Sequence, residues 1–448
     1  MITLIHFEIK NLFKQKKTGI IMLILVLLGF YLVNDYRSKA IDYEKYTLVS
    51  IQSQILRIKR EITSVQLLKD RAVDYENQVD SLNLLLDSIY RKEKAYLNQN
   101  WNDYYREEVF YNYWHVSEYS YYLNQIGNQN KIDEFIEMIE MQHMIGEKLG
   151  FPELVFSSFF SHQDAGIHSY KQFMFLNFQL WMNNANYPPT NRYTMNGSVF
   201  IYHFFGRFSL IFFVLLIFLH FSSVSDEIKN GGLKFLFSMP YKRSFFMMGK
   251  YIAGLLSSLI ILLFPLFIIS VGLYALDGIN MLDYPVLSYS QSLTSFVGIE
   301  NNLARDILQH GGNFTLGISK YSTFPAGQTD IHPALKLIPL GQFYGRLLIL
   351  IVVNFSFLIV LTNLISLILR NKFVALTTIL LLVGSGVYLS GLMQNTIWAS
   401  INPFSVMDVL AINGATSSVS LLSALSTLSL VFIVLLSIFN IIYKRTIA

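Results

Sequence analysis

Long apolar runs with almost no charged side chains recur along the sequence. A helix needs about 20 mostly apolar residues to cross the hydrocarbon core of a membrane, at a rise of about 1.5 Å per residue. Windows of this length occur six times, so the pattern predicts six transmembrane helices. The predicted spans are residues 18–34, 200–223, 249–275, 343–369, 373–393 and 420–443.

The uncharged run that contains the fifth span continues to Met407. It is too long for one crossing and too short for two crossings with a turn between them. Asn395, Asn402 and Pro403 interrupt its second part, and Trp398 suits the depth of the lipid headgroups. We therefore expect residues 394–419 to form a re-entrant or extracellular connection.

Basic residues in the short segments between spans predict the orientation. They precede span one, separate spans two and three, separate spans four and five, and follow span six. The groups are Lys10, Lys14, Lys16 and Lys17; Lys229, Lys234, Lys242, Arg243 and Lys250; Arg370 and Lys372; and Lys444 and Arg445. Because lysine and arginine concentrate in cytoplasmic loops, both termini are predicted to be cytoplasmic.

Two large segments remain outside the membrane, residues 35–199 and 276–342. In the first, apolar residues recur every three or four positions from Ile51 to Val65 and, after one slip, from Leu68 to Ile89. This spacing predicts a long helix or helical hairpin, and ordinary packing is favoured over a dimerising coiled coil. Residues 35–199 are therefore expected to form a helical extracellular domain. The second segment has little periodicity, and its structure stays open.

Aromatic residues are concentrated between positions 96 and 122 of this domain. Tyrosine and tryptophan offer a large apolar surface with a polar group, which suits an amphipathic cargo. The same density suits the core of the domain or contact with the outer leaflet, and we favour these two interpretations. The candidate residues for cargo or lipid contact are Trp101, Tyr104, Tyr105, Tyr111, Tyr113 and Trp114.

Composition and missing motifs narrow the class of protein. Hydrophobic residues make up 53% and charged residues 14%, against roughly 25% charged in a soluble domain. The chain has no cysteine, so disulfides and thiolate metal sites are excluded, and its net charge of +4 does not indicate nucleic acid. It contains no GxxxxGK[ST], HExxH or GxSxG motif, and its spans lack the charged track of an ion pathway. We expect neither an enzyme nor a metal site.

The most informative stretch runs from Ser223 to Gly254 and includes residues 224–248, the loop between spans two and three. An acidic residue, two glycines, a short apolar turn ending at a proline, a basic residue and a later lysine follow one another in it. These are Glu227, Gly231, Gly232, Leu233, Leu236, Phe237, Pro240, Arg243 and Lys250. This order resembles the coupling segment of the ABC type-2 exporter permeases. An ordinary amphipathic cytoplasmic turn is the alternative interpretation.

The resemblance implies a mainly α, polytopic membrane protein with six transmembrane helices, an N-terminal interfacial helix at residues 1–17 and a large helical extracellular domain. An outer domain of this size is similar to the subfamily that includes the A-class lipid exporters of eukaryotes and bacterial efflux or peptide-export permeases, so the expected fold is type V-like. The second outer segment is longer than is usual in that family.

The resemblance also implies partners and roles. Two ABC ATPase subunits, which bind ATP and Mg, would join this chain and a second permease, either another copy or a homologue. The chain itself would hold no cofactor. Leu233 to Met239 would form a coupling helix seated in a groove of the ATPase, with Glu227 and Arg243 fixing its base.

The expected function is export of a hydrophobic or amphipathic substrate through the plasma membrane of a bacterium. A peptide such as an antimicrobial or signalling peptide is the first candidate for the cargo, and lipid is the next. The alternatives are a receptor or sensor without an ATPase partner, and sodium or drug efflux by the same machinery.

Overall fold

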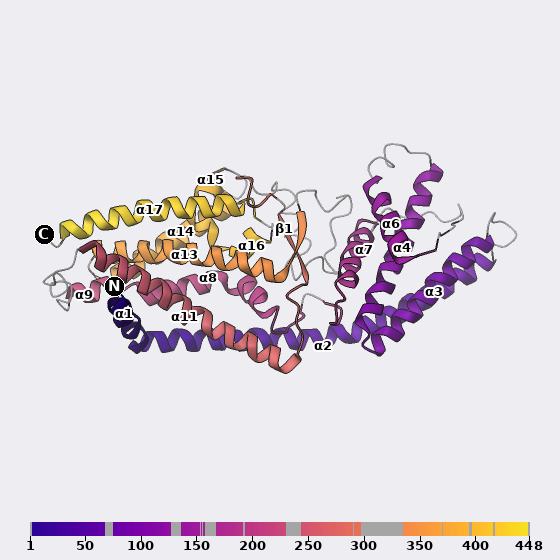
Figure 1. Cartoon of the computed structure of the whole chain (residues 1–448), viewed down its shortest axis with the longest axis horizontal. Helices are drawn as coiled ribbons and strands as arrows, with labels where there is room; N and C mark the ends of the chain where they lie inside the picture. The colour runs from indigo at the N-terminus through magenta and orange to yellow at the C-terminus, as the bar shows by residue number, and fades with distance from the viewer. Residues whose placement is uncertain are drawn as a thin grey trace.

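One helix, α2 (Lys16–Leu67), runs through most of the length of the molecule in the computed structural model (Figure 1). No glycine or proline occurs between Asp35 and Leu67, so nothing ends the helix at the predicted boundary after residue 34. Its 52 residues make a rod about 78 Å long at about 1.5 Å per residue. The first span and the first helix of the outer domain are therefore one continuous element. The structure describes residues 2–67, 75–126, 136–152, 154, 156, 167–190, 193–229, 243–289, 291–296, 335–369, 371–393, 397–414 and 417–446.

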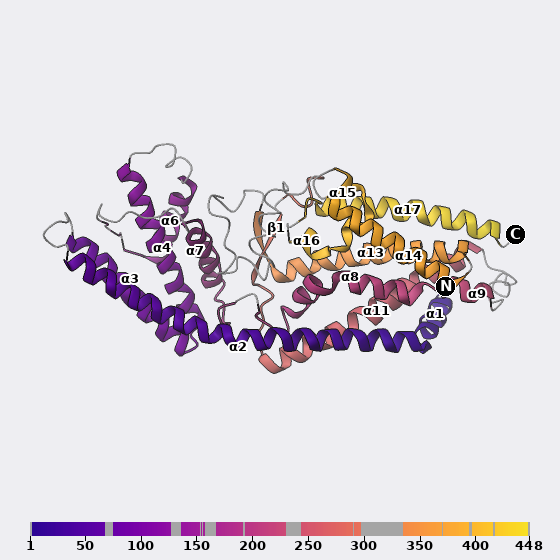
Figure 2. The same ribbon diagram turned by 180° about the vertical axis from the view of Figure 1, so that it is seen from behind.

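Within the described residues, six helices are long and apolar enough to cross a membrane. They lie along the long axis of the molecule, and both chain termini are at the same end (Figures 1 and 2). They are α2, α8 (Phe200–His220), α11 (Arg243–Asp277), α13 (Leu340–Leu369), α14 (Lys372–Leu392) and α17 (Leu421–Thr446). The predicted fold class, a mainly α polytopic membrane protein with six spans, is confirmed.

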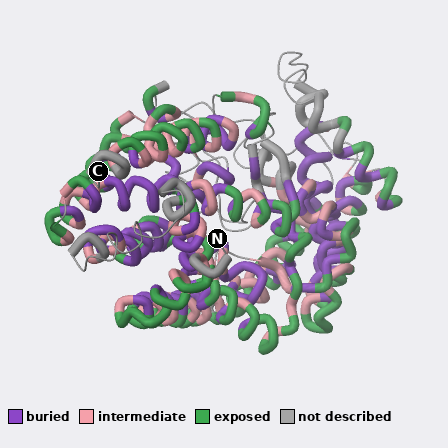
Figure 3. The backbone as a smooth tube through the Cα atoms, turned by 60° about the vertical axis from the view of Figure 1, so that its left-hand side comes forward, coloured by how far each residue is buried: buried purple, intermediate pink, exposed green. Residues whose placement is uncertain are grey.

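Helices α8 and α13 form the centre of the bundle. About two thirds or more of their most apolar windows are buried, 67% and 72%, against 22% in both α14 and α17. Phenylalanines of α8 pack against α13, where the Phe212 and Phe355 rings stack with centroids 5.7 Å apart. Figure 3 shows buried segments facing inward and exposed ones on the outside of the bundle. The exposed apolar side chains of α14 and α17 have the character expected of lipid-facing surfaces.

The connection between α14 and α17 packs against the bundle as three short helices. These are α15 (Ile397–Ile401), the 3-10 helix η1 (Pro403–Met407) and α16 (Val409–Asn413). The Ser209 Oγ donates a 2.6 Å hydrogen bond to the Met407 carbonyl, beside a kink in α8 at Phe208. The Asn354 amide of α13 donates to the Val406 carbonyl at 3.2 Å. Polar residues of the two central spans thus satisfy the main chain of this irregular segment.

The outer domain is built on the far half of α2. Helix α3 (Tyr75–Leu97) returns along it, so the apolar seam read from the sequence is a helical hairpin. Ile51, Ile58 and Val65 are buried in the same core as Leu85 and Ile89. Helices α4 (Trp101–Ile126), α6 (Ile136–Leu149) and α7 (Ile167–Met182) complete the domain, and α4 packs most extensively on α7.

A two-stranded antiparallel sheet links the outer domain to the bundle. Strand β1 (Pro285–Tyr289) pairs with β2 (Leu335–Pro339), which leads directly into α13. Tyr284 and Val286 are buried in the same core as the outer-domain helices. This part of residues 276–342 therefore joins the two parts of the molecule, and residues 297–334 lie outside the described residues.

Ion pairs fix α2 against its neighbours where the bundle meets the outer domain. Asp35 contacts both Arg207 of α8, at 2.6 Å, and Lys39 one turn further along α2, at 2.8 Å. Arg37 contacts Asp277, the last residue of α11, at 2.9 Å. Such partly exposed pairs each contribute only about 0–1 kcal/mol. Their main effect is therefore to set the orientation of α2 relative to α8 and α11.

The backbone also approaches closely at this junction. The Ser270 Oγ of α11 donates a 2.5 Å hydrogen bond to the Gly197 carbonyl, just before α8. A Cβ atom at position 197 would lie 2.7 Å from the Tyr274 nitrogen and would also collide with the Ser270 carbonyl. Because both obstacles are main-chain atoms of a helix, only glycine fits at this position.

We expect Gly197→Ala to lower the melting temperature of the purified chain in mild detergent, because overpacking against a backbone costs about 1–3 kcal/mol. Gly272→Ala is the matched control, since Gly272 lies on α11, the helix that Gly197 approaches, and a Cβ atom there would meet open space. Equal melting temperatures for the two variants would contradict the close approach.

Candidate functional site

Several helix ends meet at the end of the bundle that holds both termini, which we call the basal end (Figures 1 and 2). Helix α1 (Ile2–Lys14) lies there and packs on α11. A turn at Gln15 separates α1 from α2, and the Thr18 hydroxyl donates a 2.6 Å hydrogen bond to the Leu12 carbonyl across it. Leu12 is buried, while Phe7 and Phe13 are exposed. This amphipathic arrangement suits a helix at a membrane interface.

Helix α9 (Ser223–Lys229) follows α8 at the basal end and is held onto α13 and α14. The Ser223 hydroxyl donates to the Asn363 side-chain oxygen at 2.8 Å, and the Ser225 backbone N–H donates to the Ser366 hydroxyl at 3.2 Å. Lys372, the first residue of α14, lies 3.8 Å from the Asp226 carboxylate. Because Ser225 and Ser366 are fully buried, these contacts fix α9 to the central span α13.

Two lysines converge on the turn at the C-terminal end of α8. The Lys17 ammonium donates to the Ser222 hydroxyl at 3.2 Å and lies 5.3 Å above the Phe221 ring. The Lys250 ammonium is 3.5 Å from the Ser223 carbonyl. Since the C-terminus of a helix carries partial negative charge, both cations stabilise this turn. Helices α2 and α11 are thereby joined to the start of α9.

A cavity of about 330 Å³ lies beneath α9, between α1 and α11. His220 forms part of its wall, and its Nε2 is 2.6 Å from the Ser258 hydroxyl of α11. Glu8, Asp226 and Lys250 also line it, so positive and negative groups are both present. The cavity therefore brings residues of α1, α9 and α11 around one space at the basal end.

The predicted coupling residues are placed only in part. Gly231, Gly232, Leu233, Leu236, Phe237 and Pro240 lie outside the described residues, as do the side chains of Glu227 and Arg243. Glu227 falls within α9, and Arg243 is the first residue of α11. Lys250 is described and contacts the first residue of α9. The structure thus describes the two helices that flank residues 230–242, but not those residues themselves.

The aromatic candidates of the outer domain belong to its interior. Five of the six, all except the half-buried Trp101, are less than 9% exposed. The Trp114 indole N–H donates to the Ser81 carbonyl at 3.1 Å, and the Tyr105 hydroxyl donates to the Tyr187 carbonyl at 3.1 Å. Burial raises the pKa of Tyr104, Tyr105 and Tyr111, so their hydroxyls stay neutral at physiological pH. These hydrogen-bonded rings form the core of the domain.

The sequence pattern indicated the acidic and basic residues of the predicted coupling segment, but not the serines whose hydrogen bonds hold α9 in place. The available signal was small polar residues, Asn363 and Ser366, inside an otherwise apolar span. The Asn363 side-chain oxygen accepts a hydrogen bond from the Ser223 hydroxyl, which joins α13 to α9. Serine side chains in apolar helices are common, so their spacing alone did not identify Ser366 as a partner of α9.

The spans and the outer domain define a multi-pass membrane protein. Residues 2–301 match the family described as ABC-2 family transporter protein, and the chain belongs to this family. Membership makes it the transmembrane subunit of an ABC transporter, which associates with an ABC ATPase. Neither a curated protein nor a solved structure matches the chain.

The attachment of α9 can be tested by disulfide cross-linking, because the chain has no native cysteine. We expect the pair Ser223→Cys and Asn363→Cys to cross-link rapidly under mild oxidant, since the native side chains are in contact. Ser223→Cys with Ser385→Cys is the control, as Ser385 lies roughly 20 Å further along α14 from its basal end. Similar rates for both pairs, measured by gel mobility, would contradict the described contact.

Proposed function

We propose that this chain is the permease of an exporter that moves a hydrophobic or amphipathic molecule outward, driven by a separate ATPase. A peptide is the first candidate for the cargo and a lipid is the second. The family supports the coarser function, a transmembrane subunit of an ABC exporter. The apolar character of the spans supports a hydrophobic or amphipathic cargo. Their described polar side chains form hydrogen bonds mostly with the main chain or with one another.

The attachment of α9 is the observation that carries this proposal. A force applied to residues 230–242 would act on α9 at one side and on α11 at the other. Because α9 is hydrogen-bonded to α13 and is joined to α8 by a short turn, the force reaches the two most buried spans. ATP-driven closure of an ATPase dimer beneath the basal end would therefore rearrange the centre of the bundle.

Movement at the basal end would also reach the outer domain, because α2 is continuous between the two. Lys17 at one end of α2 contacts Ser222 beside α9, and the other end of the helix forms the core of the outer domain. A tilt of the basal half would move the outer half, because a helix transmits bending over its length. We propose that ATP-driven movement opens or closes the outer domain together with the spans.

A second permease would cover part of the exposed apolar surface. Helices α14 and α17 carry large exposed side chains, including Phe373, Tyr388 and Ile433. We propose a dimer of permeases with two ATPase subunits in a bacterial plasma membrane, with the basal end cytoplasmic. The basic residues gathered at that end support this orientation.

Copurification tests the proposed partner. We expect a P-loop ATPase to accompany the tagged chain in mild detergent and to hydrolyse ATP at a rate that candidate peptides increase. A receptor or sensor would have no such partner. If the chain purifies alone under several gentle conditions, the exporter proposal is wrong and the continuous α2 favours a sensor.

Replacing Leu236 and Phe237 tests the coupling segment. We expect Leu236→Asp with Phe237→Asp to abolish transport and peptide-stimulated hydrolysis, because charged groups would not enter an apolar groove of the ATPase. The conservative pair Leu236→Ile with Phe237→Leu should retain both activities. Membrane insertion, followed by fractionation, should be the same for all forms. Unchanged transport by the aspartate variant would overturn the assignment.

A further inference from the structure

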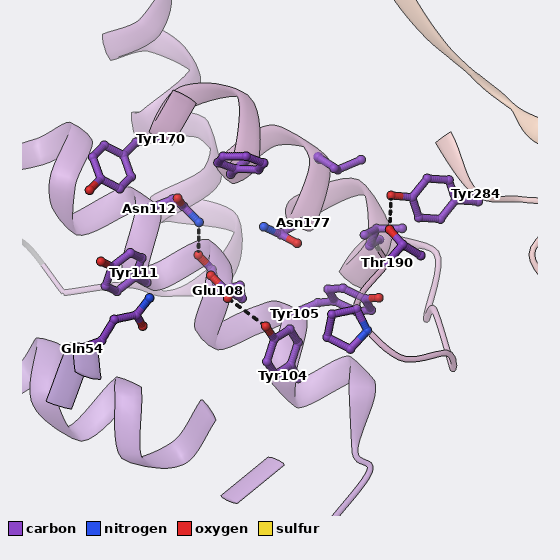
Figure 4. Close-up of a pocket in the computed structure, with 14 residues that line it drawn as sticks. Gln54, Tyr104, Tyr105, Glu108, Tyr111, Asn112, Tyr170, Asn177, Thr190 and Tyr284 are labelled. Atoms are coloured by element: carbon purple, nitrogen blue, oxygen red, sulfur yellow. Dashed lines mark hydrogen bonds between the residues drawn. The ribbon is translucent and has the colours of Figure 1, made fainter. Parts of the chain in front are cut away.

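A cavity of about 330 Å³ lies inside the outer domain, between α4 and α7 (Figure 4). Residues on one face of α4 and on one face of α7, three or four positions apart, line this cavity. Gln54 of α2 closes one side of it. The volume is within the range of about 300–1000 Å³ that is typical of ligand sites. The coupling mechanism proposed above does not use this cavity.

Three side-chain amides lie around the cavity. Asn177 of α7 makes no hydrogen bond within the described part of the chain. Asn112 of α4 donates through its amide nitrogen to the Glu108 carbonyl at 2.5 Å, which leaves the amide oxygen as an acceptor. Gln54 accepts from the Lys92 ammonium at 2.8 Å, which leaves its NH₂ group as a donor. Together they offer donors and acceptors of the kind that pair with peptide groups.

The charge in the cavity is already compensated. The Glu108 carboxylate accepts from the Tyr104 hydroxyl at 2.9 Å and lies 3.5 Å from the Lys92 ammonium. Lys92 is fully buried and lies 4.5 Å above the Tyr111 ring. Among the lining residues that the structure describes, none is a lysine or an arginine. A phosphate or other anionic headgroup would therefore face a carboxylate without a cation to bind it.

The cavity walls combine aromatic rings with short aliphatic side chains, which suits a bulky apolar side chain better than a long acyl chain. Tyr105, Tyr170 and Phe173 present rings, while Leu176 and Leu180 add aliphatic surface. Burial raises the pKa of Tyr284, which closes one end of the cavity, to about 12, so its hydroxyl is a neutral hydrogen-bonding group. An acyl chain would leave the Asn177 amide, the Asn112 amide oxygen and the Gln54 NH₂ group without partners, which is costly in a buried site.

We propose that this cavity binds a short peptide segment through one aromatic or bulky apolar side chain, with its main-chain amides hydrogen-bonded to Gln54, Asn112 and Asn177. The proposal rests on the proposed function for the role of the peptide as cargo. The chemical class of the occupant is inferred from the cavity alone. Because Gln54 belongs to α2, an occupant would touch the helix that continues through the membrane.

The test uses the full chain in lipid nanodiscs without an ATPase. The probe is N-acetyl-6-fluorotryptophanamide, one aromatic side chain flanked by two amide groups, observed by fluorine NMR. We expect saturable binding that unlabelled N-acetyltryptophanamide displaces and N-acetylglycinamide does not. Asn177→Leu should weaken the affinity at least tenfold, because it removes the amide and keeps a branched side chain with the same number of heavy atoms. Asn183→Leu, at an exposed position just beyond the end of α7, should bind as the native chain does.

Three outcomes overturn the proposal. Absence of saturable binding to the native chain excludes a peptide site. Equal affinities of the two leucine variants exclude a role for Asn177, and tighter binding of the probe or of lysophosphatidylcholine by Asn177→Leu would indicate an apolar lipid site. Melting temperatures check folding, and Asn177→Ala replaces the leucine variant if that variant does not fold. Probe binding without a copurifying ATPase would keep the peptide site and reject the exporter.

Discussion

The unbroken main-chain hydrogen bonding of α2 is the constraint on which the rest of the structure depends. A helix in a membrane must satisfy every peptide group within itself, and α2 extends this requirement beyond the bundle for its full 52 residues. The outer domain consequently cannot rotate freely on a loop. Its core is assembled on the same rod that crosses the membrane, and the ion pairs of Asp35 and Arg37 hold that rod against α8 and α11.

Polar residues in the bundle form hydrogen bonds that hold neighbouring segments together. Ser209 and Asn354 bind the irregular main chain between α14 and α17. Asn363 and Ser366 bind α9. Unpaired polar groups are costly in an apolar environment, so each of these residues specifies one arrangement of neighbouring segments. A permease that responds to a partner at its basal end needs such specific joints, because loosely packed helices would absorb the movement.

The outer domain differs from the bundle in its chemistry. Its interior combines tyrosine rings with amides and a compensated carboxylate, as at Tyr104, Glu108 and Lys92. Such an interior is well suited to binding a molecule with both apolar and hydrogen-bonding parts. The bundle below it is apolar and closely packed. Recognition of a peptide and its movement across the membrane would then belong to different parts of one chain, connected by α2.

The sequence by itself determined the number of spans, the mainly α class and the family. Length and hydropathy decide which segments can enter a membrane, and the residues from Glu227 to Lys250 follow the order of a family motif. Only the tertiary structure decided that α2 continues past residue 34, that the aromatic residues are buried, and that Gln54, Asn112 and Asn177 surround one cavity. These features depend on contacts between residues far apart in the chain, such as Arg57 of α2 with Tyr111 of α4 and the packing of α4 on α7. Local periodicity carries no information about which faces meet.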